Sequence, residues 1–449
     1  MPNIKRIILL IGDIAVLYVS LWLMLFIRYG AKFDINTWEQ HFKPFTLIYV
    51  IWLIVFFIAG LYDISLARNN INFYSTLLRG LTINIGIAIT FFYFLPFFGI
   101  TPKTNLFLNI GVFAILFAGW RQLYNYLVKS SALINNVLII GKNKEIDQII
   151  KIVENNPQLS YKIIKQMSPQ DIKTPFDILE IATSKNIKTI ITAIDPHQDT
   201  RLVQSLYQCL PLKISFNDLP SFYEKILGKV PVSSIGEIWF LENLTESQKN
   251  FYEAFKRVLD MLGALIFGII SLLFFPLVIL VIKITSSGPI FIKQRRIGHD
   301  GQIFILYKFR TMYATEEDGS SEPEGKPVYA QINDPRITKI GNFLRKTRLD
   351  ELPQFWNVLI GQMSFIGPRP ERIEFVQQCE KRTPHYQIRH IVKPGLTGWA
   401  QVNFRYGASV EDSIEKLQYE LYYIKHRSFI LDLSIMLRTI KIILKGGGR

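Results

Sequence analysis

The chain has 449 residues, of which 49% are hydrophobic and 19% charged, and 51 Lys and Arg against 36 Asp and Glu give a net charge of +15. Such a sequence is not disordered, because disordered chains are poor in apolar residues and rich in charge. Two cysteines, Cys209 and Cys379, are too few for a disulfide framework or a zinc site and are expected to be buried thiols. The basic excess suits anionic partners such as nucleic acid, anionic lipid or a phosphorylated substrate.

Four long apolar stretches precede residue 130, and each approaches the ~20 residues that a membrane-spanning helix needs. They are Ile7–Ile27, Pro44–Tyr62, the stretch between Arg79 and Lys103, and the stretch between Lys103 and Arg121. The first lacks the small-x-small cleavage site of a signal peptide, so we expect an uncleaved helix. Basic residues in Lys5–Arg6, Arg68–Arg79 and Arg121–Lys129 fall on one common side of the spans. Residues 1–130 are therefore predicted to form a four-helix transmembrane domain with both ends in the cytoplasm.

Asp13 interrupts the first apolar stretch. An ionisable residue inside a membrane is a candidate proton or ion site. The alternative is a carboxylate that faces the interior of the bundle and is hydrogen-bonded there. We favour this alternative, because the sequence shows no partner charge at matching depth.

Residues 131–235 alternate between strand and helix patterns. Strands are predicted at Val137–Ile140, Tyr161–Ile164, Thr189–Thr192 and Leu212–Ser215, and helices around Ile146–Ile152, Phe176–Ser184 and Thr200–Cys209. This alternation predicts a parallel, doubly wound sheet, a Rossmann-like α/β module. The turn after the first strand, Gly141–Glu145, reads G-K-N-K-E and lacks the G-x-G-x-x-G fingerprint. We therefore expect the module to bind no cofactor and to be structural, regulatory or dimerising.

A further apolar stretch, Val258–Ile282, opens the last part of the chain, residues 250–449. Basic residues flank it on both sides, Lys256–Arg257 before it and Lys283 after it. Two basic flanks suit neither orientation of a span, but they suit a helix that enters and leaves the membrane on one side. Pro276 supplies the break that such a re-entrant helix needs. A proline-kinked fifth span is the alternative.

Three segments of this last part carry groups suited to phosphate chemistry. The predicted strand Phe304–Met312 places Lys308 and Arg310 on one face, where they could grip a diphosphate or simply be solvated. Arg369 stands between two prolines and could present its guanidinium to a phosphate, although the segment could equally be a structural loop.

The third segment is the pair Asp350 and Glu351, which follows three cations within five residues and precedes Pro353. The proline predicts a helix that starts near Glu351, and a helix N-terminus favours both carboxylates and phosphates. Two adjacent carboxylates among cations suit phosphoryl transfer with a divalent metal, one acting as nucleophile and the other holding the metal or a proton. A plain acidic N-cap is the alternative.

Two more segments carry weaker signals. Thr315–Lys326 is an acidic loop with glycine, serine and proline, which is either a lid or a solvated loop. Leu417–Leu444 alternates apolar faces with basic residues and suits interfacial helices against anionic headgroups, although an ordinary amphipathic helix has the same pattern.

Five motifs stand in order along residues 250–449. They are K-F-R-T-M from Lys308, N-D-P-R-I-T from Asn333, L-D-E-L-P-Q from Leu349, M-S-F-I-G-P-R-P from Met363 and P-G-L-T-G-W-A-Q-V-N from Pro394. This ordered set resembles the bacterial sugar transferases, the monotopic phosphoglycosyl transferases. The four spans and the α/β module are similar to the large members, the polyprenyl-phosphate hexose-1-phosphate transferases of the undecaprenyl-phosphate glucose or galactose type.

The resemblance implies an activity and a location. The chain would transfer a sugar-1-phosphate from a UDP-sugar to undecaprenyl phosphate, releasing UMP, with Mg²⁺ and through a phosphosugar-aspartyl intermediate. This would be the first membrane step of exopolysaccharide, capsule or O-antigen synthesis. The implied location is the bacterial inner membrane, with the catalytic domain on the cytoplasmic face and the lipid bilayer as a partner. A homodimer is compatible with the sequence, and nucleic acid is not an expected partner.

The resemblance also assigns roles to residues. Asp350 matches the family nucleophile, and Glu351 matches its partner, which is associated with the metal and with proton handling. The matched phosphate-binding positions are Lys308, Arg310, Arg345 and Arg369. Phe275–Pro276 matches the break of the re-entrant helix, which usually reads Ser-Pro.

Two further positions depart from the family pattern. Gln362 stands where G-D-M-S usually has Asp, and Phe404 replaces the usual Gly of Q-V-N-G-R beside the expected sugar or nucleotide pocket. The dyad and the phosphate-facing cations are intact, so the transferase interpretation holds.

The expected fold is a membrane α-helical bundle of four spans, a Rossmann-like α/β cytoplasmic module and a mainly α catalytic domain anchored by a re-entrant helix. Three alternatives remain open. A transporter or channel would need functional polar residues in the spans, where Asp13 is the candidate. A membrane-anchored nucleotide sensor or regulator would need a glycine-rich phosphate turn. A polytopic transferase without a covalent intermediate would show sequential kinetics.

Overall fold

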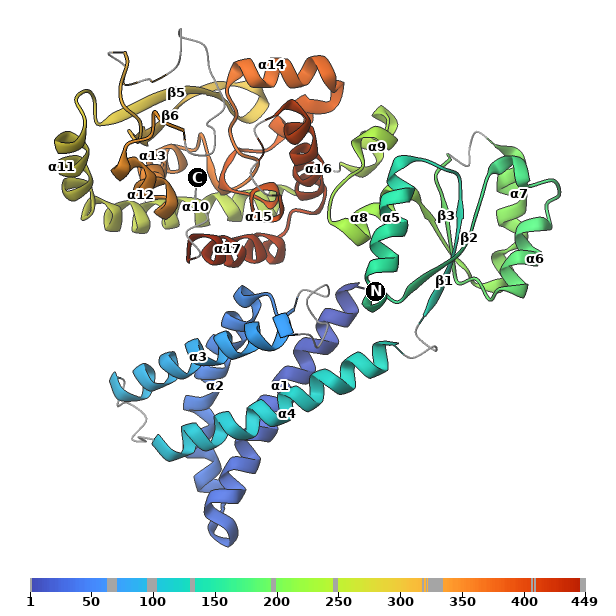
Figure 1. The fold of residues 1–449 in the computed structure, drawn as a ribbon, viewed down its shortest axis with the longest axis horizontal. Coiled ribbons are helices and arrows are strands. Elements are labelled where there is room, and N and C mark those ends of the chain that lie inside the picture. Colours follow the sequence, from blue (N-terminus) through green and yellow to red (C-terminus); the bar gives the residue numbers. More distant parts are fainter. Residues whose placement is uncertain are drawn as a thin grey trace. The chain divides into compact units, whose positions relative to one another are not determined.

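The computed structural model describes residues 2–62, 71–94, 103–129, 134–194, 199–244, 249–316, 319, 321, 334–404, 407 and 409–444. The chain divides into two compact units, Met1–Ile226 and Leu227–Arg449 (Figure 1). Arg68, Asn333 and residues 317–318, 320 and 322–326 of the predicted acidic loop lie outside the described residues.

Four long helices open the first unit: α1 (Pro2–Tyr29), α2 (Ile35–Ala59), α3 (Ile71–Phe94) and α4 (Lys103–Lys129). Each contains a stretch long and apolar enough to cross a membrane, which agrees with the four predicted spans. Three boundaries differ from the prediction. The fourth helix continues past Arg121 to Lys129, so Arg121, expected to follow the fourth span, is a buried residue within α4. The second helix begins at Ile35, with Asp34 as its N-cap and Pro44 inside it. Arg79, expected to precede the third span, is an exposed residue within α3.

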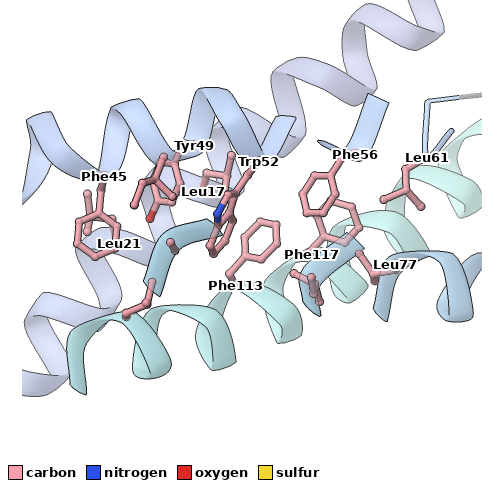
Figure 2. Close-up of a cluster of buried hydrophobic side chains, with 14 of the residues drawn as sticks. Leu17, Leu21, Phe45, Tyr49, Trp52, Phe56, Leu61, Leu77, Phe113 and Phe117 are labelled. Atoms are coloured by element: carbon pink, nitrogen blue, oxygen red, sulfur yellow. The ribbon is translucent and has the colours of Figure 1, made fainter. Parts of the chain in front are cut away.

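Aromatic side chains fill the interior of this helix bundle (Figure 2). Trp52 and Phe56 of α2 pack against Phe113 of α4, with ring centroids 5.7 and 6.0 Å away. The approach of α1 to α4 depends on Gly12, because a Cβ at this position would overlap the ring of Trp120.

Asp13 lies inside the same bundle and is fully buried. Its Oδ2 accepts a hydrogen bond of 2.6 Å from Nη2 of Arg121, which is also buried. The structure thus confirms a carboxylate that faces inward and is hydrogen-bonded. The expectation that it lacks a partner charge was wrong, since Arg121 comes from α4, far away in the sequence.

A four-stranded parallel sheet forms the rest of the first unit. Its strands are β1 (Asn135–Ile140), β2 (Tyr161–Met167), β3 (Thr189–Thr192) and β4 (Ser215–Asp218), in the order β2-β1-β3-β4. The connecting helices are α5 (Lys144–Asn155), α6 (Asp177–Ser184) and α7 (Thr200–Gln208), and α8 (Leu219–Leu227) follows the last strand. The predicted parallel sheet is therefore present. Its fourth strand begins at Ser215, because Leu210–Leu212 forms a 3₁₀ turn.

The turn after β1 has a single glycine with a strict backbone requirement. Gly141 has φ +115°, and a Cβ there would lie 2.8 Å from Cβ of Ala193. The next helix is capped by the chain itself, because the Asn143 side chain accepts a hydrogen bond of 2.8 Å from the Ile146 amide.

The second unit surrounds two small sheets with helices. Its helices are α9 (Glu237–Asn243), α10 (Asn250–Leu272), α11 (Phe275–Thr285), α12 (Lys339–Thr347), α13 (Gln354–Leu359), α14 (Ile373–Arg382), α15 (Trp399–Asn403), α16 (Val410–His426) and α17 (Phe429–Leu444). The antiparallel pair is β5 (Phe291–Ile297) with β6 (Ile303–Phe309), and the parallel pair is β7 (Ser364–Ile366) with β8 (Gly395–Thr397). The core of this unit also includes Val230, Trp239 and Phe240, which precede residue 250.

The predicted helix break is present as a sharp bend. Helices α10 and α11 meet at an angle of 55°, with residues 273–274 between them. Pro276 is the second residue of α11, where the helix needs no donor from it. The ring of Phe275 packs on that of Phe309, with centroids 4.9 Å apart. The bend fits either a broken span or a re-entrant pair of helices.

Candidate active site

The acidic pair lies on a short 3₁₀ turn, η12 (Leu349–Glu351), between α12 and α13. Helix α12 ends at Thr347, and Arg348, which caps it, has a left-handed backbone (φ +60°) that turns the chain into η12. A non-glycine residue in this region costs roughly 1–2 kcal/mol, and such strain is often found at functional sites. The following helix begins at Gln354 after Pro353, so the pair sits one turn before the helix rather than at its first residues.

Leucines on both sides of the acidic pair anchor the turn. Leu349 and Leu352 pack against a hydrophobic cluster formed by α11, β6 and α12. At the start of α12, a Cβ on Gly341 would overlap the backbone of Thr311, so helix and strand end are in direct contact. The L-D-E-L pattern therefore fixes the backbone of the two carboxylates through its apolar residues.

Glu351 is held by three cations from three parts of the fold. Its Oε1 lies 3.3 Å from Nζ of Lys308 on β6, 3.3 Å from Nη1 of Arg348 and 3.2 Å from Nη2 of Arg369. Burial alone would raise the pKa of Glu351, but the charges of Lys308, Arg369 and Arg348 outweigh burial and hold the pKa well below its usual value. Glu351 therefore stays ionised.

Asp350 is in a different state from its neighbour. It is 7% exposed, and among the described residues its Oδ1 has no hydrogen-bond partner. Burial and, next, the charge of Glu351 raise its pKa to about 6, against the opposing charges of Lys308, Arg345 and Arg348. The oxygen is uncommitted and the carboxyl still ionises near neutral pH, which makes Asp350 a candidate nucleophile.

The cations around the two carboxylates outnumber them. Lys308, Arg345 and Arg348 act on Asp350, and Arg369 joins at Glu351. Burial lowers the pKa of Lys308 to about 8, although the charge of Glu351 opposes this. Such a surplus of half-buried positive charge is stabilised by a bound anion, and a diphosphate has the charge to match it.

The predicted phosphate ligands do not all meet. Lys308 and Arg369 contact Glu351 directly, and Nε of Arg345 donates to Thr311 at 2.8 Å. Arg310 follows the end of β6 and is 2% exposed, and its guanidinium donates to the carbonyl oxygens of Ser286 and Ser287. The structure therefore gives Arg310 a structural contact behind α11, and its role toward phosphate stays a prediction.

Sequence reasoning did not place Arg348 among the site residues. Its spacing of three residues from Glu351 is the signal that could have found it, because residues three apart on a helical turn face each other. The contact of Arg348 with Glu351 adds a reason for its unusual backbone conformation.

The two departures from the family motifs occupy definite places. The amide of Asn357 donates to Oε1 of Gln362 at 2.8 Å and to the carbonyl of Ile305 at 2.7 Å, which ties the end of α13 to β6. Phe404 is the C-cap of α15, and the centroid of its ring lies 6.3 Å from that of Tyr419. The contacts found for Gln362 support the fold next to the acidic turn.

A magnesium ion could be held by the two carboxylates together with the phosphates of a substrate. Among the described residues, no group of three or more His, Cys, Asp or Glu side chains gathers as a metal site. Mg²⁺ does not need one, because it commonly binds through one or two carboxylates together with substrate phosphates and water. The ionised Glu351 and the unpartnered Oδ1 of Asp350 are oxygen donors of the required kind.

Comparison with known proteins covers both units. The family model described as bacterial sugar transferase matches residues 251–446. The chain is 39% identical over 246 residues to a UDP-N-acetylgalactosamine-undecaprenyl-phosphate N-acetylgalactosaminephosphotransferase of Aeromonas hydrophila, covering 54% of this chain and 55% of that protein.

Two further relatives are each named UDP-glucose:undecaprenyl-phosphate glucose-1-phosphate transferase. The Escherichia coli K12 protein is 31% identical, covering 72% of this chain and 69% of its own length. The Xanthomonas campestris protein is 29% identical, covering 71% and 68%. The chain thus spans about half of the Aeromonas protein and just over two thirds of the other two.

Proposed function

The chain belongs to the bacterial sugar transferase family, and from this membership and the geometry around Asp350 we propose that it transfers a sugar-1-phosphate from a UDP-sugar to undecaprenyl phosphate. The observation that carries the proposal is a buried, uncommitted carboxylate oxygen beside an ionised carboxylate in a surplus of cations. The reaction would be the first membrane step in building a polysaccharide. The named relatives use different sugars, so the donor sugar is left open.

In the first step, an oxygen of the Asp350 carboxylate attacks the donor phosphorus that carries the sugar. The bond from this phosphorus to the bridging oxygen breaks, and UMP leaves with the electron pair. Asp350 then carries the sugar phosphate as an acyl phosphate. In the second step, a phosphate oxygen of undecaprenyl phosphate attacks the same phosphorus, and the carboxylate of Asp350 leaves.

The cations supply binding and charge stabilisation in both steps. Lys308 and Arg369 converge on Glu351, where they would also meet the non-bridging oxygens of the diphosphate. The low pKa of Glu351 keeps it ionised throughout. A magnesium ion held by Glu351 and the donor diphosphate would neutralise charge on the leaving UMP.

Removal of divalent metal by EDTA is therefore expected to abolish turnover, and added Mg²⁺ is expected to restore it.

We place the catalytic unit on the cytoplasmic face of the bacterial inner membrane, with α10 and α11 as a re-entrant pair. The 55° bend and the basic residues at both ends of the pair support this placement. The outer face of α10 exposes apolar side chains, among them Leu262, Ile266 and Ile269. On α17, Ile430 is 84% and Leu444 76% exposed, as expected of a helix that lies in the interface.

The topology has its own test. Single cysteines at Asn250 and Ser287, on a background with Cys209 and Cys379 replaced by serine, would mark the two ends of the helix pair. A re-entrant pair predicts that a membrane-impermeant thiol reagent labels both from the cytoplasmic side. Labelling from opposite sides would show a fifth span.

UMP release tests the reaction itself. Purified protein in nanodiscs is mixed with undecaprenyl phosphate, Mg²⁺ and each of a panel of UDP-sugars. We expect release with one or a few sugars and none with Asp350→Asn. Release with no sugar would contradict the proposed reaction.

A further inference from the structure

The turn that carries Arg369 is fixed by hydrogen bonds that its backbone carbonyl oxygens accept from other parts of the fold. Pro368 and Pro370 have no N–H, so the backbone on either side of Arg369 offers mainly acceptors. A side chain that must point at Glu351 therefore depends on donors from other elements to fix this backbone.

Four consecutive carbonyls of this turn each accept a hydrogen bond. The Pro368 oxygen accepts from the Gly395 amide at 2.8 Å, and the Glu371 oxygen from the Ile297 amide at 3.2 Å. Between them, Arg389 donates from Nη2 to the Arg369 oxygen at 2.8 Å, and Arg296 donates from Nη1 to the Pro370 oxygen at 3.2 Å. The donors come from β8, the end of β5 and the 3₁₀ segment η13 (Pro384–Ile391).

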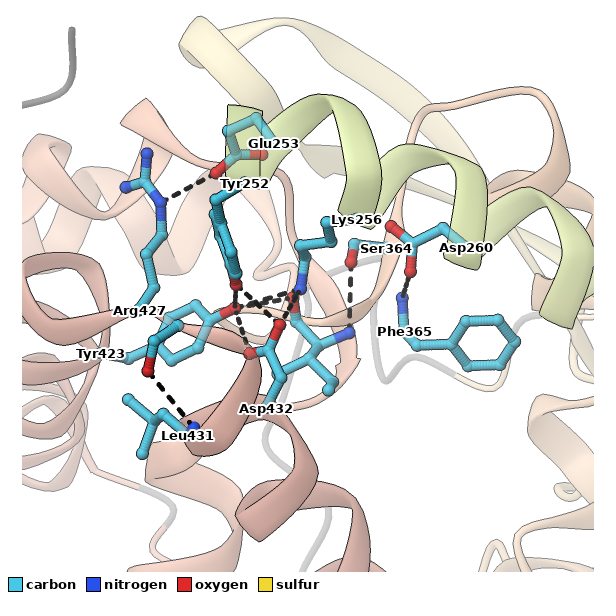
Figure 3. Close-up of polar contacts among 12 residues, drawn as sticks. Tyr252, Glu253, Lys256, Asp260, Ser364, Phe365, Tyr423, Arg427, Leu431 and Asp432 are labelled. Carbon is cyan, nitrogen blue, oxygen red and sulfur yellow. Dashed lines mark hydrogen bonds and ion pairs between the residues drawn. The ribbon is translucent and has the colours of Figure 1, made fainter. Parts of the chain in front are cut away.

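A similar arrangement fixes the chain just before the turn (Figure 3). The Ile366 oxygen accepts from Nζ of Lys256 at 2.9 Å and from the hydroxyl of Tyr423 at 3.3 Å. Lys256 is in turn paired with Asp432 at 3.1 Å. Buried charged side chains thus hold carbonyl oxygens both before the turn and within it.

Arg389 is the donor that acts on Arg369 itself, and it is oriented by a buried carboxylate. Its Nη2 lies 2.7 Å from Oε1 of Glu420 on α16, and the two side chains are 2% and 4% exposed. Its Nη1 donates to the hydroxyl of Tyr386 at 2.9 Å. A buried ion pair is weak evidence for stability, because desolvation offsets most of its attraction. Its contact with the Arg369 carbonyl gives this pair a second role.

We propose that Arg389, oriented by Glu420, is a positioning residue that fixes the backbone of Arg369 so that its guanidinium meets Glu351 and the donor diphosphate. The proposal rests on the proposed sugar-1-phosphate transfer. Arg389 touches neither Glu351 nor Asp350 in any described contact, so its effect on turnover would pass through Arg369.

A double-mutant cycle on UMP release tests this coupling. Arg389→Gln is expected to lower kcat/KM by about ten- to a hundredfold, because a displacement of about 1 Å at a reacting group costs up to that much. The same change in an Arg369→Ala background is expected to cost less than about twofold, because the residue it acts through is gone. Losses that multiply in the double variant would overturn the proposal.

Two further variants guard against simple misfolding. Arg389→Lys keeps a charge beside Glu420 and a donor for the carbonyl, and it is expected to retain most of the activity lost in Arg389→Gln. The matched control is Arg382→Gln, which removes an ion pair with Glu411 that is 68% and 70% exposed and is expected to change nothing. Equal losses in the lysine and glutamine variants would contradict the positioning role.

Hydrogen exchange provides a readout that does not depend on turnover. The amides of Gly395 and Ile297 donate to the turn, so Arg389→Gln is expected to speed their exchange while Arg382→Gln does not. If the wild type releases no UMP with any donor, the proposed reaction fails, and exchange alone decides whether Arg389 orders the turn. Unchanged exchange at both amides would overturn the proposal.

Discussion

The membrane helices bury one carboxylate against one guanidinium, Asp13 against Arg121, whereas the turn after α12 gathers two carboxylates among four cations. In the first region the charges cancel, and neither side chain has more than 1% exposure. In the second, four cations act on two carboxylates, so two positive charges are left over.

The difference separates a structural use of buried charge from a functional one. A matched pair cancels its own charge, so it joins α1 to α4 without an ion from outside the chain. A surplus of half-buried cations attracts an anion from outside the chain. By this criterion the Arg389–Glu420 pair is also matched, and its contribution is to place a neighbour of the unmatched cluster.

The largest effect is expected at the unmatched cluster. Asp350→Asn should reduce UMP release by at least about a thousandfold, because an amide cannot replace the carboxylate as nucleophile. Release is measured with the preferred UDP-sugar at saturating Mg²⁺. Asp300→Asn is the control, since its carboxylate is 64% exposed and pairs only with His299 among the contacts described. A variant at Asp350 with full activity would remove the covalent mechanism.

Substitutions in the Asp13–Arg121 pair should lower the stability of the protein rather than its activity. Asp13→Asn or Arg121→Gln alone is expected to cost about 3–5 kcal/mol, because each leaves a buried charge without its partner. The double variant should recover part of this loss. Thermal unfolding in detergent measures the effect. If Asp13→Asn instead abolished turnover and left stability unchanged, the Asp13–Arg121 pair would be functional, and the assignment of a structural role to it would be wrong.

Lys308 and Arg310 sharpen the same distinction at two neighbouring positions. Lys308→Gln is expected to lower kcat/KM by about 10- to 100-fold, mainly through KM, because a charged hydrogen bond contributes about 1.5–3 kcal/mol. Arg310→Gln should lower the thermal midpoint and leave KM unchanged, because its partners are the carbonyls of Ser286 and Ser287. A rise in KM for Arg310→Gln would show that it binds phosphate after all.

The smallest effect concerns acid stability next to the Arg389–Glu420 pair. Burial and, next, the charge of Arg389 lower the pKa of His390 to about 3. The unfolded chain takes up this proton near pH 6.5, so stability is full above that pH and is lost as the pH falls toward 3. At pH 5 the loss is about 2 kcal/mol. His390→Gln should flatten this part of the stability curve between pH 7 and 5, and an unchanged slope would show that His390 is not the group responsible.

Much of the fold follows from patterns within short windows of sequence. Apolar length identified the four membrane helices, and strand periodicity located β1 and β3 to within two residues. Contacts between distant segments were not readable in this way. Nothing in the sequence around Asp13 indicates that Arg121 faces it from α4, since that depends on how the helices pack.

The charges of the candidate site were predictable, and its geometry was less so. Adjacent carboxylates among cations predicted Asp350 and Glu351 as a catalytic pair; the structure shows the charged cluster, and the catalytic roles stay predictions. The alternation of side chains along a strand predicted that Arg310 lies on the same face as Lys308. However, β6 ends at Phe309, and the side chain of Arg310 turns toward Ser286, which follows α11. The positioning role of Arg389 depends on a backbone carbonyl, which no residue pattern reveals.

The most direct test of the central claim is intact-mass measurement of the protein after incubation with the preferred UDP-sugar and Mg²⁺, without undecaprenyl phosphate. The account predicts a mass gain equal to one sugar phosphate, accompanied by one equivalent of UMP. The added mass should be absent in Asp350→Asn and should disappear when undecaprenyl phosphate is added. UMP release that requires both substrates together, with no change in protein mass, would contradict a covalent role for Asp350.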